Sequence, residues 1–394
     1  MSSVRILILH NAYKFAGGED RAVVADQELL RSRGHETLVY HRSFNELEGL
    51  SPLTTAGLAT QAFWSRTSYV AIRKIVDDWR PDVAHFHNIV PLISPSGYEA
   101  CRAAGVPVVQ TLHNYRLICP AGTLLRDGVV CELCVGKSLW PSIHYSCYRG
   151  SRRESVVLAG SLTAHRLLGT WDRRVDAYIA LTTFGKEMFI KGGLPADRIH
   201  VRHNALDVPT PAQYRGPHSA IFVGRLSPEK GVRVLLNAWA TLPEIPLTIV
   251  GDGPLMSEVR DRVAKNDMRH VKVVGELPHH EVLERVRAAG MLIFPSLWYE
   301  GLGYAMVEAL SLGIPIIASK MGVQLEVVIH GVTGLHFTPG DPSALVAAVQ
   351  ELRSSDGLAG RLAEAARRDF LERYSPEQSY GQLMNVYSHV GASA

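Results

Sequence analysis

The segment 295–310, PSLWYEGLGYAMVEAL, carries two glutamates, Glu300 and Glu308, in an otherwise apolar run. If the whole segment were helical, the two would be separated by about 12 Å along the helix axis. Two carboxylates that act on one glycosidic bond lie roughly 5 to 9.5 Å apart. The spacing therefore favours two anchors for the ends of one extended ligand. The alternative is structural, because acidic side chains near a helix N-terminus are stabilised by its partial positive charge.

Two cations follow the apolar run SAIFV in the segment GRLSPEKGV, namely Arg225 and Lys230. Such a pair suits a diphosphate, since a guanidinium offers a planar fork of donors and an ammonium a point charge. Lys230 stands beside Glu229 and could instead be a solvated surface residue. Arg225 directly follows an apolar run and a glycine, so we expect its charge to require a partner.

Histidines follow two further apolar runs. In PDVAHFHN, His85 and His87 alternate with Phe86 and therefore project from one face of a strand. His113 and Asn114 follow the run VPVVQTL. The alternative for each histidine is a hydrogen-bonded core residue, which we favour for His85, whereas the pair His113 and Asn114 at a strand end favours a functional role.

Four of the five cysteines lie in one short region, as Cys119, Cys131, Cys134 and Cys147, with the spacing C-x11-C-x2-C-x12-C. A C-x2-C pair with two flanking cysteines is a ligand set for a closed, structural zinc site. Two disulfides or four unligated thiols are the alternatives, and disulfides are disfavoured in a reducing cytoplasm. We therefore expect a structural zinc and no catalytic metal.

The elements that position these residues alternate regularly along the chain. Continuous apolar runs typical of strands buried on both faces alternate with segments of helical spacing, which predicts parallel sheets covered by helices. The predicted strands are VRILILH, PDVAHFHN, GVPVVQTLH, VDAYIALT, SAIFVGRL, PLTIVGDGP, HVKVVGEL, AGMLIFPS and GIPIIAS. The proline-rich stretch HNALDVPTPAQYRGPH interrupts the series and predicts a linker. The fold class is thus α/β, with two doubly wound, Rossmann-like domains whose ligands bind at the carboxyl ends of the strands.

Composition and charge indicate a two-domain protein and do not favour a nucleic-acid-binding or membrane-spanning one. A chain of 394 residues that is 46% hydrophobic suits two domains, and a formal net charge of +3 does not favour a nucleic-acid partner. The basic run RGSRRES could nevertheless contact phosphate groups or an anionic membrane surface. The apolar run near the N-terminus is too short for a signal peptide or a spanning helix. We therefore expect a soluble cytoplasmic protein, with peripheral contact at the inner membrane face as an option.

Several of these motifs together resemble the retaining nucleotide-sugar glycosyltransferases of family 4, which have the GT-B fold. The resemblance spans nearly the whole chain, and its motifs are AGGED, DVAHFHN, LHN, VGRLSPEKGV, VGDGPL and PSLWYEGLGYAMVEAL. One departure is MGVQLE at 321–326, where relatives often read GGxPE, so the loop around Glu326 is expected to differ.

The resemblance implies roles for individual residues. Glu300 matches the glutamate that contacts the donor sugar, Glu308 the one that holds the nucleotide ribose, and His113 a histidine near the sugar. Arg225 and Lys230 match ligands of the diphosphate, and we expect these two with Glu300 and His113 to carry catalysis. The remaining implied donor-side residues are Gly17, Gly18, Gly251, Leu277, Gly301, Leu302 and Gly303, and the implied acceptor-side residues are Glu19, Asp20, His87, Asn88 and Asn114.

The resemblance also implies the division of the chain and its reaction. Residues 1–205 with 374–394 would form the acceptor-side domain, including the cysteine-rich insert 119–147, and residues 206–373 the donor domain. The donor would be a nucleoside-diphosphate sugar and the acceptor a hydroxyl group of a glycan, lipid-linked or small molecule. The resemblance leaves the base of the nucleotide open, and we expect UDP, with GDP next. Retention without a covalent nucleophile implies attack from the face that the phosphate leaves. The alternatives are a nucleotide-sugar epimerase or phosphorylase on the same fold and a non-catalytic nucleotide-sugar binding protein.

Overall fold

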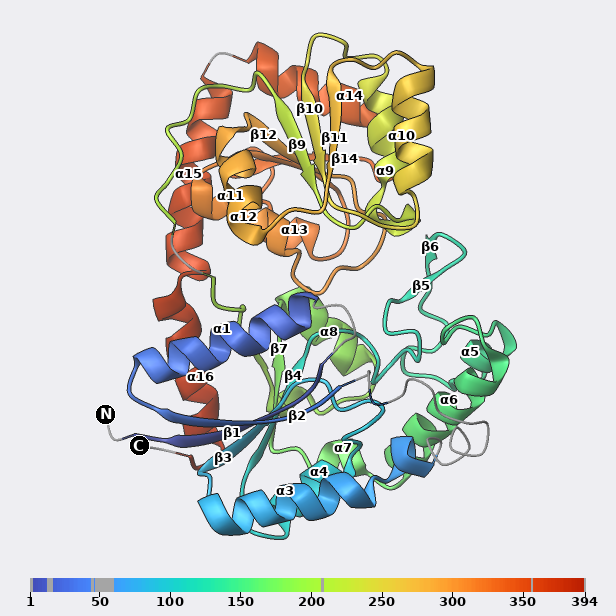
Figure 1. Ribbon diagram of the computed structural model, residues 1–394, viewed down its shortest axis with the longest axis vertical. Helices are drawn as coiled ribbons and strands as arrows, with labels where there is room; N and C mark the ends of the chain where they lie inside the picture. Colours follow the sequence, from blue (N-terminus) through green and yellow to red (C-terminus); the bar gives the residue numbers. More distant parts are fainter. Residues whose placement is uncertain are drawn as a thin grey trace. The chain divides into compact units, whose positions relative to one another are not determined.

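A computed structural model describes residues 3–12, 17–43, 46, 60–206, 209–355 and 357–392. Residues 13–16 of the expected glycine loop and 207–208 of the expected linker lie outside the described residues. The chain divides into two compact units, and the colours of Figure 1 follow the sequence through both. The first comprises Met1–Leu124, Cys131–Ala205 and Pro376–Ala394, and the second Leu125–Val130 and Leu206–Ser375. The segment Leu125–Val130, which the sequence analysis placed with the rest of the insert, groups with the second unit.

The first unit is built on a parallel six-stranded sheet with the order β2-β1-β3-β4-β7-β8. Its strands are β1 (Arg5–Ala12), β2 (Glu36–Ser43), β3 (Val83–Phe86), β4 (Val108–Leu112), β7 (Ala177–Ala180) and β8 (Ile199–Val201). The helices of this unit are α1 (Gly18–Ser32), α3 (Arg66–Trp79), α4 (Ser96–Arg102), α5 (Trp140–His144), α6 (Arg152–Leu167), α7 (Thr170–Arg173), α8 (Thr183–Lys191), the 3-10 turn Ala196–Arg198 and α16 (Pro376–His389).

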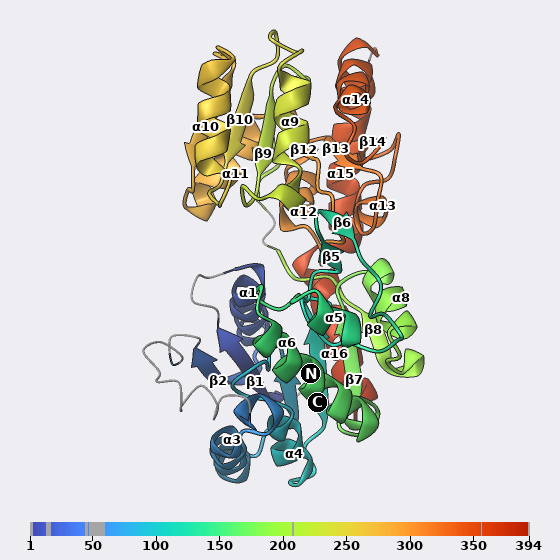
Figure 2. The same ribbon diagram turned by 90° about the vertical axis from the view of Figure 1, so that its right-hand side faces the viewer.

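The second unit repeats this architecture with the order β11-β10-β9-β12-β13-β14, again all parallel. Its strands are β9 (Ala220–Val223), β10 (Leu247–Val250), β11 (Val271–Gly275), β12 (Met291–Phe294), β13 (Ile316–Ser319) and β14 (Gly334–Phe337). Its helices are the 3-10 turn Pro228–Lys230, α9 (Val232–Trp239), α10 (Met256–Lys265), α11 (His279–Ala288), α12 (Tyr304–Leu312), α13 (Gln324–Val327), α14 (Pro342–Ser354) and α15 (Leu358–Arg373). Figure 1 shows α9, α10 and α14 on one side of this sheet and α11, α12 and α15 on the other, and Figure 2 shows the same unit turned by 90°.

The α/β class and all nine predicted strands are confirmed. Among the described residues, five further strands were not predicted, namely β2, β8, β14 and the two-residue strands β5 (Leu125–Arg126) and β6 (Val129–Val130). β2 is the outermost strand of its sheet and alternates exposed with half-buried residues, so it lacks the continuous apolar run that marks the central strands. β8 has only three residues, which is too short for a periodic pattern.

The core of the first unit joins residues from both ends of the chain. Ile6 and Ile8 of β1 share a buried cluster with Leu383 and Tyr387 of α16. Beneath the same helix, Arg202 forms an ion pair with Asp26 of α1, and the two side chains are 0% and 1% exposed. The Arg202 guanidinium also donates a hydrogen bond to the main-chain oxygen of Ser379. The last helix is therefore an integral layer of the first unit.

No helix among the described residues is both long and apolar enough to cross a membrane.

Candidate functional site

Each sheet reverses its strand order at one point, and in doubly wound sheets ligands bind beside the carboxyl ends of the strands at that point. In the second unit the reversal lies between β9 and β12, which are neighbours. The loop after β9 carries Arg225 and Lys230, and the loop after β12 carries Glu300. In the first unit it lies between β1 and β3, which are followed by Gly17 and by His87. The sequence-predicted residues thus gather at the two expected places.

Lys230 and Glu300 form a direct ion pair at the reversal point of the second unit. The ammonium Nζ lies 2.7 Å from Glu300 Oε1 and 2.9 Å from Oε2. The ammonium also faces the rings of Phe294 and Trp298, at 5.9 and 5.3 Å from their centroids. Ser296 Oγ donates to Glu300 Oε1 at 2.6 Å. The buried carboxylate is therefore held in place by a cation and a hydroxyl.

Glu308 is fixed by a different partner. It lies within α12, is buried, and its Oε1 is 2.8 Å from Nε2 of the exposed His279 at the start of α11. The segment around the two glutamates is not one helix, because α12 begins only at Tyr304, after Gly303 with φ of 77°. Glu300 therefore precedes the helix by four residues, and the two carboxylates are presented by a loop and by a helix.

Glycines allow the loops of this site to pack directly on one another. A Cβ on Gly231 would lie 1.9 Å from the main-chain oxygen of Pro295, and one on Gly251 would lie 2.0 Å from that of Gly224. Leu297 N also donates to Glu229 O at 2.7 Å, and Leu226 N to Asp252 O at 2.9 Å. The loops after β9, β10 and β12 are consequently braced into one surface.

The other expected donor-side residues occupy the same edge of the sheet. Arg225 is exposed, so its guanidinium is accessible to an anion. Leu277 is half-buried after β11, Leu302 is buried, and Gly301 is half-buried between Glu300 and Leu302. Glu326 lies in the short helix α13, half-buried, in the loop where the sequence departs from the family pattern.

The histidines of the first unit divide into two kinds. His85 Nδ1 bonds the hydroxyl of Tyr387 at 2.8 Å and its Nε2 that of Thr111 at 2.7 Å. Burial lowers the pKa of His85 to about 3, against an opposing effect of Asp26. Both ring nitrogens are occupied within the core, so the structural interpretation of His85 is the one that the geometry supports. Its neighbour Phe86 points to the other face, against α4.

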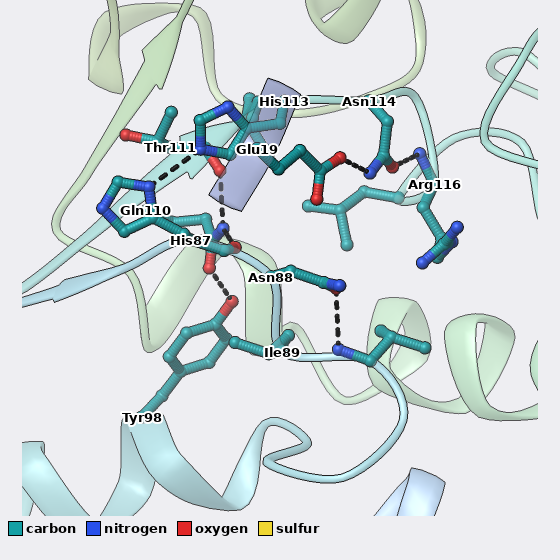
Figure 3. Close-up of a pocket in the computed structure, with 13 residues that line it drawn as sticks. Glu19, His87, Asn88, Ile89, Tyr98, Gln110, Thr111, His113, Asn114 and Arg116 are labelled. Atoms are coloured by element: carbon teal, nitrogen blue, oxygen red, sulfur yellow. Dashed lines mark hydrogen bonds between the residues drawn. The ribbon is translucent and has the colours of Figure 1, made fainter. Parts of the chain in front are cut away.

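His87 and His113 form a stacked, hydrogen-bonded pair, shown in Figure 3, with 2.8 Å between His87 Nδ1 and His113 Nε2. Burial lowers the pKa of both rings, that of His87 well below its ordinary value. Since one nitrogen of the pair must donate and the other accept, two neutral rings satisfy the contact. The bond therefore fixes the orientation of the His113 ring.

Glu19 and Asn114 close the same small pocket, whose volume is about 30 Å³ (Figure 3). Asn114 Nδ2 donates to Glu19 Oε1 at 2.5 Å, and the Arg116 main-chain N–H donates to Asn114 Oδ1 at 3.0 Å. A space of this size holds about one water. These side chains therefore shape a wall, and the pocket beneath them does not admit a sugar.

Asp20, Asn88 and the glycines belong to the framework of this wall. Asp20 Oδ2 accepts a hydrogen bond from Gly17 N at 2.8 Å, and this bond caps the N-terminus of α1, which begins at Gly18. The other carboxylate oxygen of Asp20, Oδ1, lies 2.9 Å from His10 Nε2. Asn88 is buried and its Oδ1 accepts from Val90 N at 3.2 Å. The start of α1 is thus occupied by its own acidic first turn, which the partial positive charge of the helix N-terminus stabilises.

The four cysteines of the insert are all thiols; Cys119 and Cys134 are buried, and Cys131 and Cys147 half-buried. Burial, together with the neighbouring thiols of Cys119, Cys147 and Cys131, raises the pKa of Cys134 to about 11.

Three partners at these sites were not identified from the sequence: Ser296, His279 and His10. Ser296 lies four residues before Glu300, and His279 follows the strand segment HVKVVGEL closely, as Arg225 follows its own strand. A search for polar residues after every predicted strand would have included both. His10 lies within a predicted strand, where nothing in the local pattern distinguishes it from a core residue.

Two family models match in succession along the chain. The model described as Glycosyltransferase Family 4 matches residues 17–209, and that described as Glycosyl transferases group 1 matches residues 210–369. The chain is 29% identical over 303 residues to the glycogen synthase of Mycobacterium tuberculosis, which is 74% of this chain and 64% of that relative. It is 25% identical over 313 residues to the alpha-D-kanosaminyltransferase of Streptomyces kanamyceticus, 75% of this chain and 73% of that protein.

Solved structures share the fold at low identity. Anabaena Alr3699/HepE in complex with UDP superposes with a TM-score of 0.68 and 19% identity, over 98% of this chain and 99% of that one. Sucrose-phosphate synthase from Thermosynechococcus elongatus superposes with a TM-score of 0.69 and 18% identity, over 99% and 100%. With both units matched in sequence and in fold, the chain belongs to glycosyltransferase family 4 and has the GT-B fold.

Proposed function

We propose that this glycosyltransferase transfers a sugar from a nucleoside-diphosphate sugar, with UDP as the favoured nucleotide, to a hydroxyl acceptor with retention of configuration. The observation that carries the proposal is the contact between Lys230 and Glu300 at the strand-order reversal of the second unit. In a nucleotide sugar, the anionic phosphate and the sugar hydroxyls are separated by a few bonds. A cation and a carboxylate in direct contact can therefore bind both at once.

The donor would extend from this pair along the loops braced against one another. Glu300 would accept hydroxyl hydrogen bonds from the sugar, Lys230 and the exposed Arg225 would contact the diphosphate, and Glu308 would accept from the ribose. His279 supports this arrangement, because its contact with Glu308 Oε1 holds the Glu308 carboxylate in a fixed orientation. The choice of UDP is supported by HepE, a protein of the same fold whose structures contain UDP and UDP-glucose.

The chemistry follows from charge development on the leaving group. As the bond between the sugar and the phosphate lengthens, negative charge gathers on the diphosphate, and fixed cations stabilise that charge more than the ground state. The leaving phosphate oxygen accepts the proton of the attacking hydroxyl, and the new bond forms on the face that the phosphate leaves. Glu300 would orient the sugar within the donor unit.

We place the acceptor at a membrane surface because of the outward face of α6. Val156, Val157 and Leu167 on that helix are 49%, 36% and 81% exposed, and Arg152 and Arg153 precede them. Val156 and Val157 also line an open apolar hollow together with Phe63 and Trp64. An apolar stripe with cations at one end suits the interface of an anionic bilayer. The acceptor would then be lipid-linked and the protein peripheral, at the cytoplasmic face.

A thermal-shift panel of UDP, GDP, ADP and TDP tests the donor. A ligand at 100 times its dissociation constant stabilises the protein by about 2.7 kcal/mol, so UDP should raise the melting temperature most. Product analysis with the matching UDP-sugar then tests transfer and the configuration of the new bond. No stabilisation by any of the four nucleotides would overturn the donor assignment.

Two other functions make different predictions. An epimerase on this fold would interconvert nucleotide sugars with no acceptor present. A non-catalytic binding protein would bind the nucleotide sugar without hydrolysing it, whereas a transferase releases the sugar slowly to water. Incubation with donor alone, followed by analysis of the nucleotide and the sugar, distinguishes the three.

A further inference from the structure

The second unit has a hollow at the edge of its sheet opposite to the candidate donor site. The hollow has a volume of about 550 Å³, and its lining residues lie in two segments, 213–219 and 284–290. These segments lead into the amino ends of β9 and β12, whose carboxyl ends lead to Arg225 and Glu300. Sites for small molecules have volumes of roughly 300 to 1,000 Å³. This cavity, which we call the amino-edge hollow, is therefore large enough for a ligand of its own.

The floor of the amino-edge hollow consists of main-chain segments that pack directly on one another. A Cβ on Gly290 would lie 2.5 Å from Gly216 O and 2.8 Å from His218 N, so only glycine fits there. Gly290 N donates to Ser219 O at 3.0 Å, and the hydroxyl of Tyr214 donates to Gly290 O at 2.9 Å. The two segments are therefore joined, and the shape of the hollow is set before any ligand binds.

Two guanidinium groups line the amino-edge hollow, against one carboxylate. Arg215 is exposed and forms no ion pair with another described residue. Arg287 Nη1 lies 2.7 Å from Glu284 Oε1, and its Nη2 donates to Thr210 O at 3.1 Å. Its Nε is buried without a hydrogen-bond partner in the described part of the chain. The protein thus satisfies one guanidinium only in part and leaves the other open to a ligand.

The amino-edge hollow also offers hydrogen-bond acceptors. It adjoins the C-terminus of α11, where the last main-chain carbonyls have no partner within the helix. The Glu284 side chain is 64% exposed, and its exposed pair with Arg287 is of a kind that contributes little to stability, so an anion can replace it. The partial negative charge at a helix C-terminus disfavours a ligand that is anionic throughout. The lining therefore suits a molecule with an anionic group at one end and hydroxyl groups elsewhere.

We propose that the amino-edge hollow binds a sugar phosphate, at a site separate from that of the nucleotide sugar. Arg215 and Arg287 hold the phosphate, because a guanidinium presents a planar fork of donors to its oxygens. Glu284 and the carbonyls at the end of α11 accept hydrogen bonds from the sugar hydroxyls. Inorganic phosphate lacks the hydroxyl groups and glucose lacks the anion, so each uses only part of the lining. The ligand is bound without a bond being made or broken.

Calorimetric titration of the full chain tests this site independently of sugar transfer. The probes are glucose 6-phosphate, glucose 1-phosphate and ribose 5-phosphate, with inorganic phosphate and glucose for comparison. We expect at least one sugar phosphate to bind about tenfold or more tightly than phosphate or glucose, and to lose about tenfold or more in Arg215→Gln and in Arg287→Gln. The matched control is Arg269→Gln, because Arg269 is an exposed cation of the same unit that pairs with Asp267. Binding should persist in Arg225→Ala, which alters the candidate donor site.

Several results would overturn the proposed site, and the first needs no variant. No binding of any of the three sugar phosphates to the wild type would exclude this ligand class, and so would equal affinity for inorganic phosphate. Loss of binding in Arg225→Ala, with full binding in Arg215→Gln, would assign the phosphate to the candidate donor site. If Arg287→Gln does not fold, because Arg287 also holds the main chain of Thr210, the exposed Arg215 decides the assignment alone.

Discussion

Lys230 Nζ lies within 2.9 Å of both carboxylate oxygens of Glu300, so each charge at the donor end of this site is already neutralised by the other. Because both side chains are largely buried, the pair resists separation, and its position is set by the loops that carry it. A ligand can therefore contact both groups without displacing either side chain from the ion pair. The pair is thus arranged in advance, as stabilisation of a transition state requires.

The two glutamates should have separable effects. Glu300→Gln removes the charge that orients the sugar, so we expect turnover to fall by about a hundredfold or more, with affinity for free UDP nearly unchanged. Glu308→Gln should instead weaken UDP binding, because its carboxylate is assigned to the ribose. Calorimetric titration with UDP and initial rates on both variants check this division. Equal loss of UDP affinity in both variants would contradict this division of roles. The control is Glu258→Gln, on the exposed face of α10.

Arg225 offers a test of the diphosphate role without a cost in stability. Its side chain is exposed, so Arg225→Ala should change the free energy of unfolding by less than about 0.5 kcal/mol. Transfer should nevertheless fall by about a hundredfold if the guanidinium stabilises the leaving group. Urea titration and rate measurements on the same preparation compare the two effects. Wild-type activity in this variant would remove Arg225 from the site.

Lys230→Ala should behave differently, because it also leaves the buried Glu300 without its cation. We expect both the transfer rate and the stability to fall, and the stability to recover in the double variant Lys230→Ala, Glu300→Gln, while the rate does not. A stability unchanged in Lys230→Ala would show that the ion pair contributes nothing to the folded state.

The sequence predicted the fold well because the central strands are short apolar runs separated by helical patterns. Such strands are buried on both faces, and their carboxyl ends indicate where Arg225, Lys230 and Glu300 must lie. The edge strand β2 has no such signature and was missed. The local pattern therefore predicts strands that carry a continuous apolar run, whereas β2 is determined by its pairing with β1.

The partners within the site were less predictable. His279 and Glu308 are on different helices, and their contact depends on how α11 and α12 pack. Likewise, the occupied nitrogens of His85 depend on Tyr387, which lies 302 residues away in the chain. A sequence shows which groups need partners, whereas the partner across such a distance is settled only by the packing of complete elements.

The buried histidines should make stability depend on pH. His85 has a pKa of about 3 in the folded chain and about 6.5 unfolded, so below pH 6.5 the unfolded chain binds the extra proton. Its contribution is fully present above pH 6.5 and is lost as the pH falls toward 3. Between pH 7.5 and 5.5 we expect a loss of about 1.4 kcal/mol from His85 alone. Urea unfolding at both pH values measures this loss, which should shrink in His85→Gln; an unchanged pH dependence would exclude His85 as its source.

The exposed stripe of α6 should bind anionic membranes. We expect the protein to sediment with vesicles containing phosphatidylglycerol, less with pure phosphatidylcholine, and less as salt is raised, because Arg152 and Arg153 would contribute about 1 kcal/mol each near the surface. The double change Val156→Glu, Val157→Glu adds two negative charges to the stripe and should abolish sedimentation without disturbing UDP binding, which depends on the second unit. Val332→Glu is the matched control, because Val332 is 45% exposed in a loop of the second unit and should leave sedimentation unchanged. Sedimentation that is equal with neutral and anionic vesicles, or absent with both, would contradict a membrane-borne acceptor. If the protein instead forms a concentration-dependent dimer that the two valine changes break, the stripe binds a second copy of the chain.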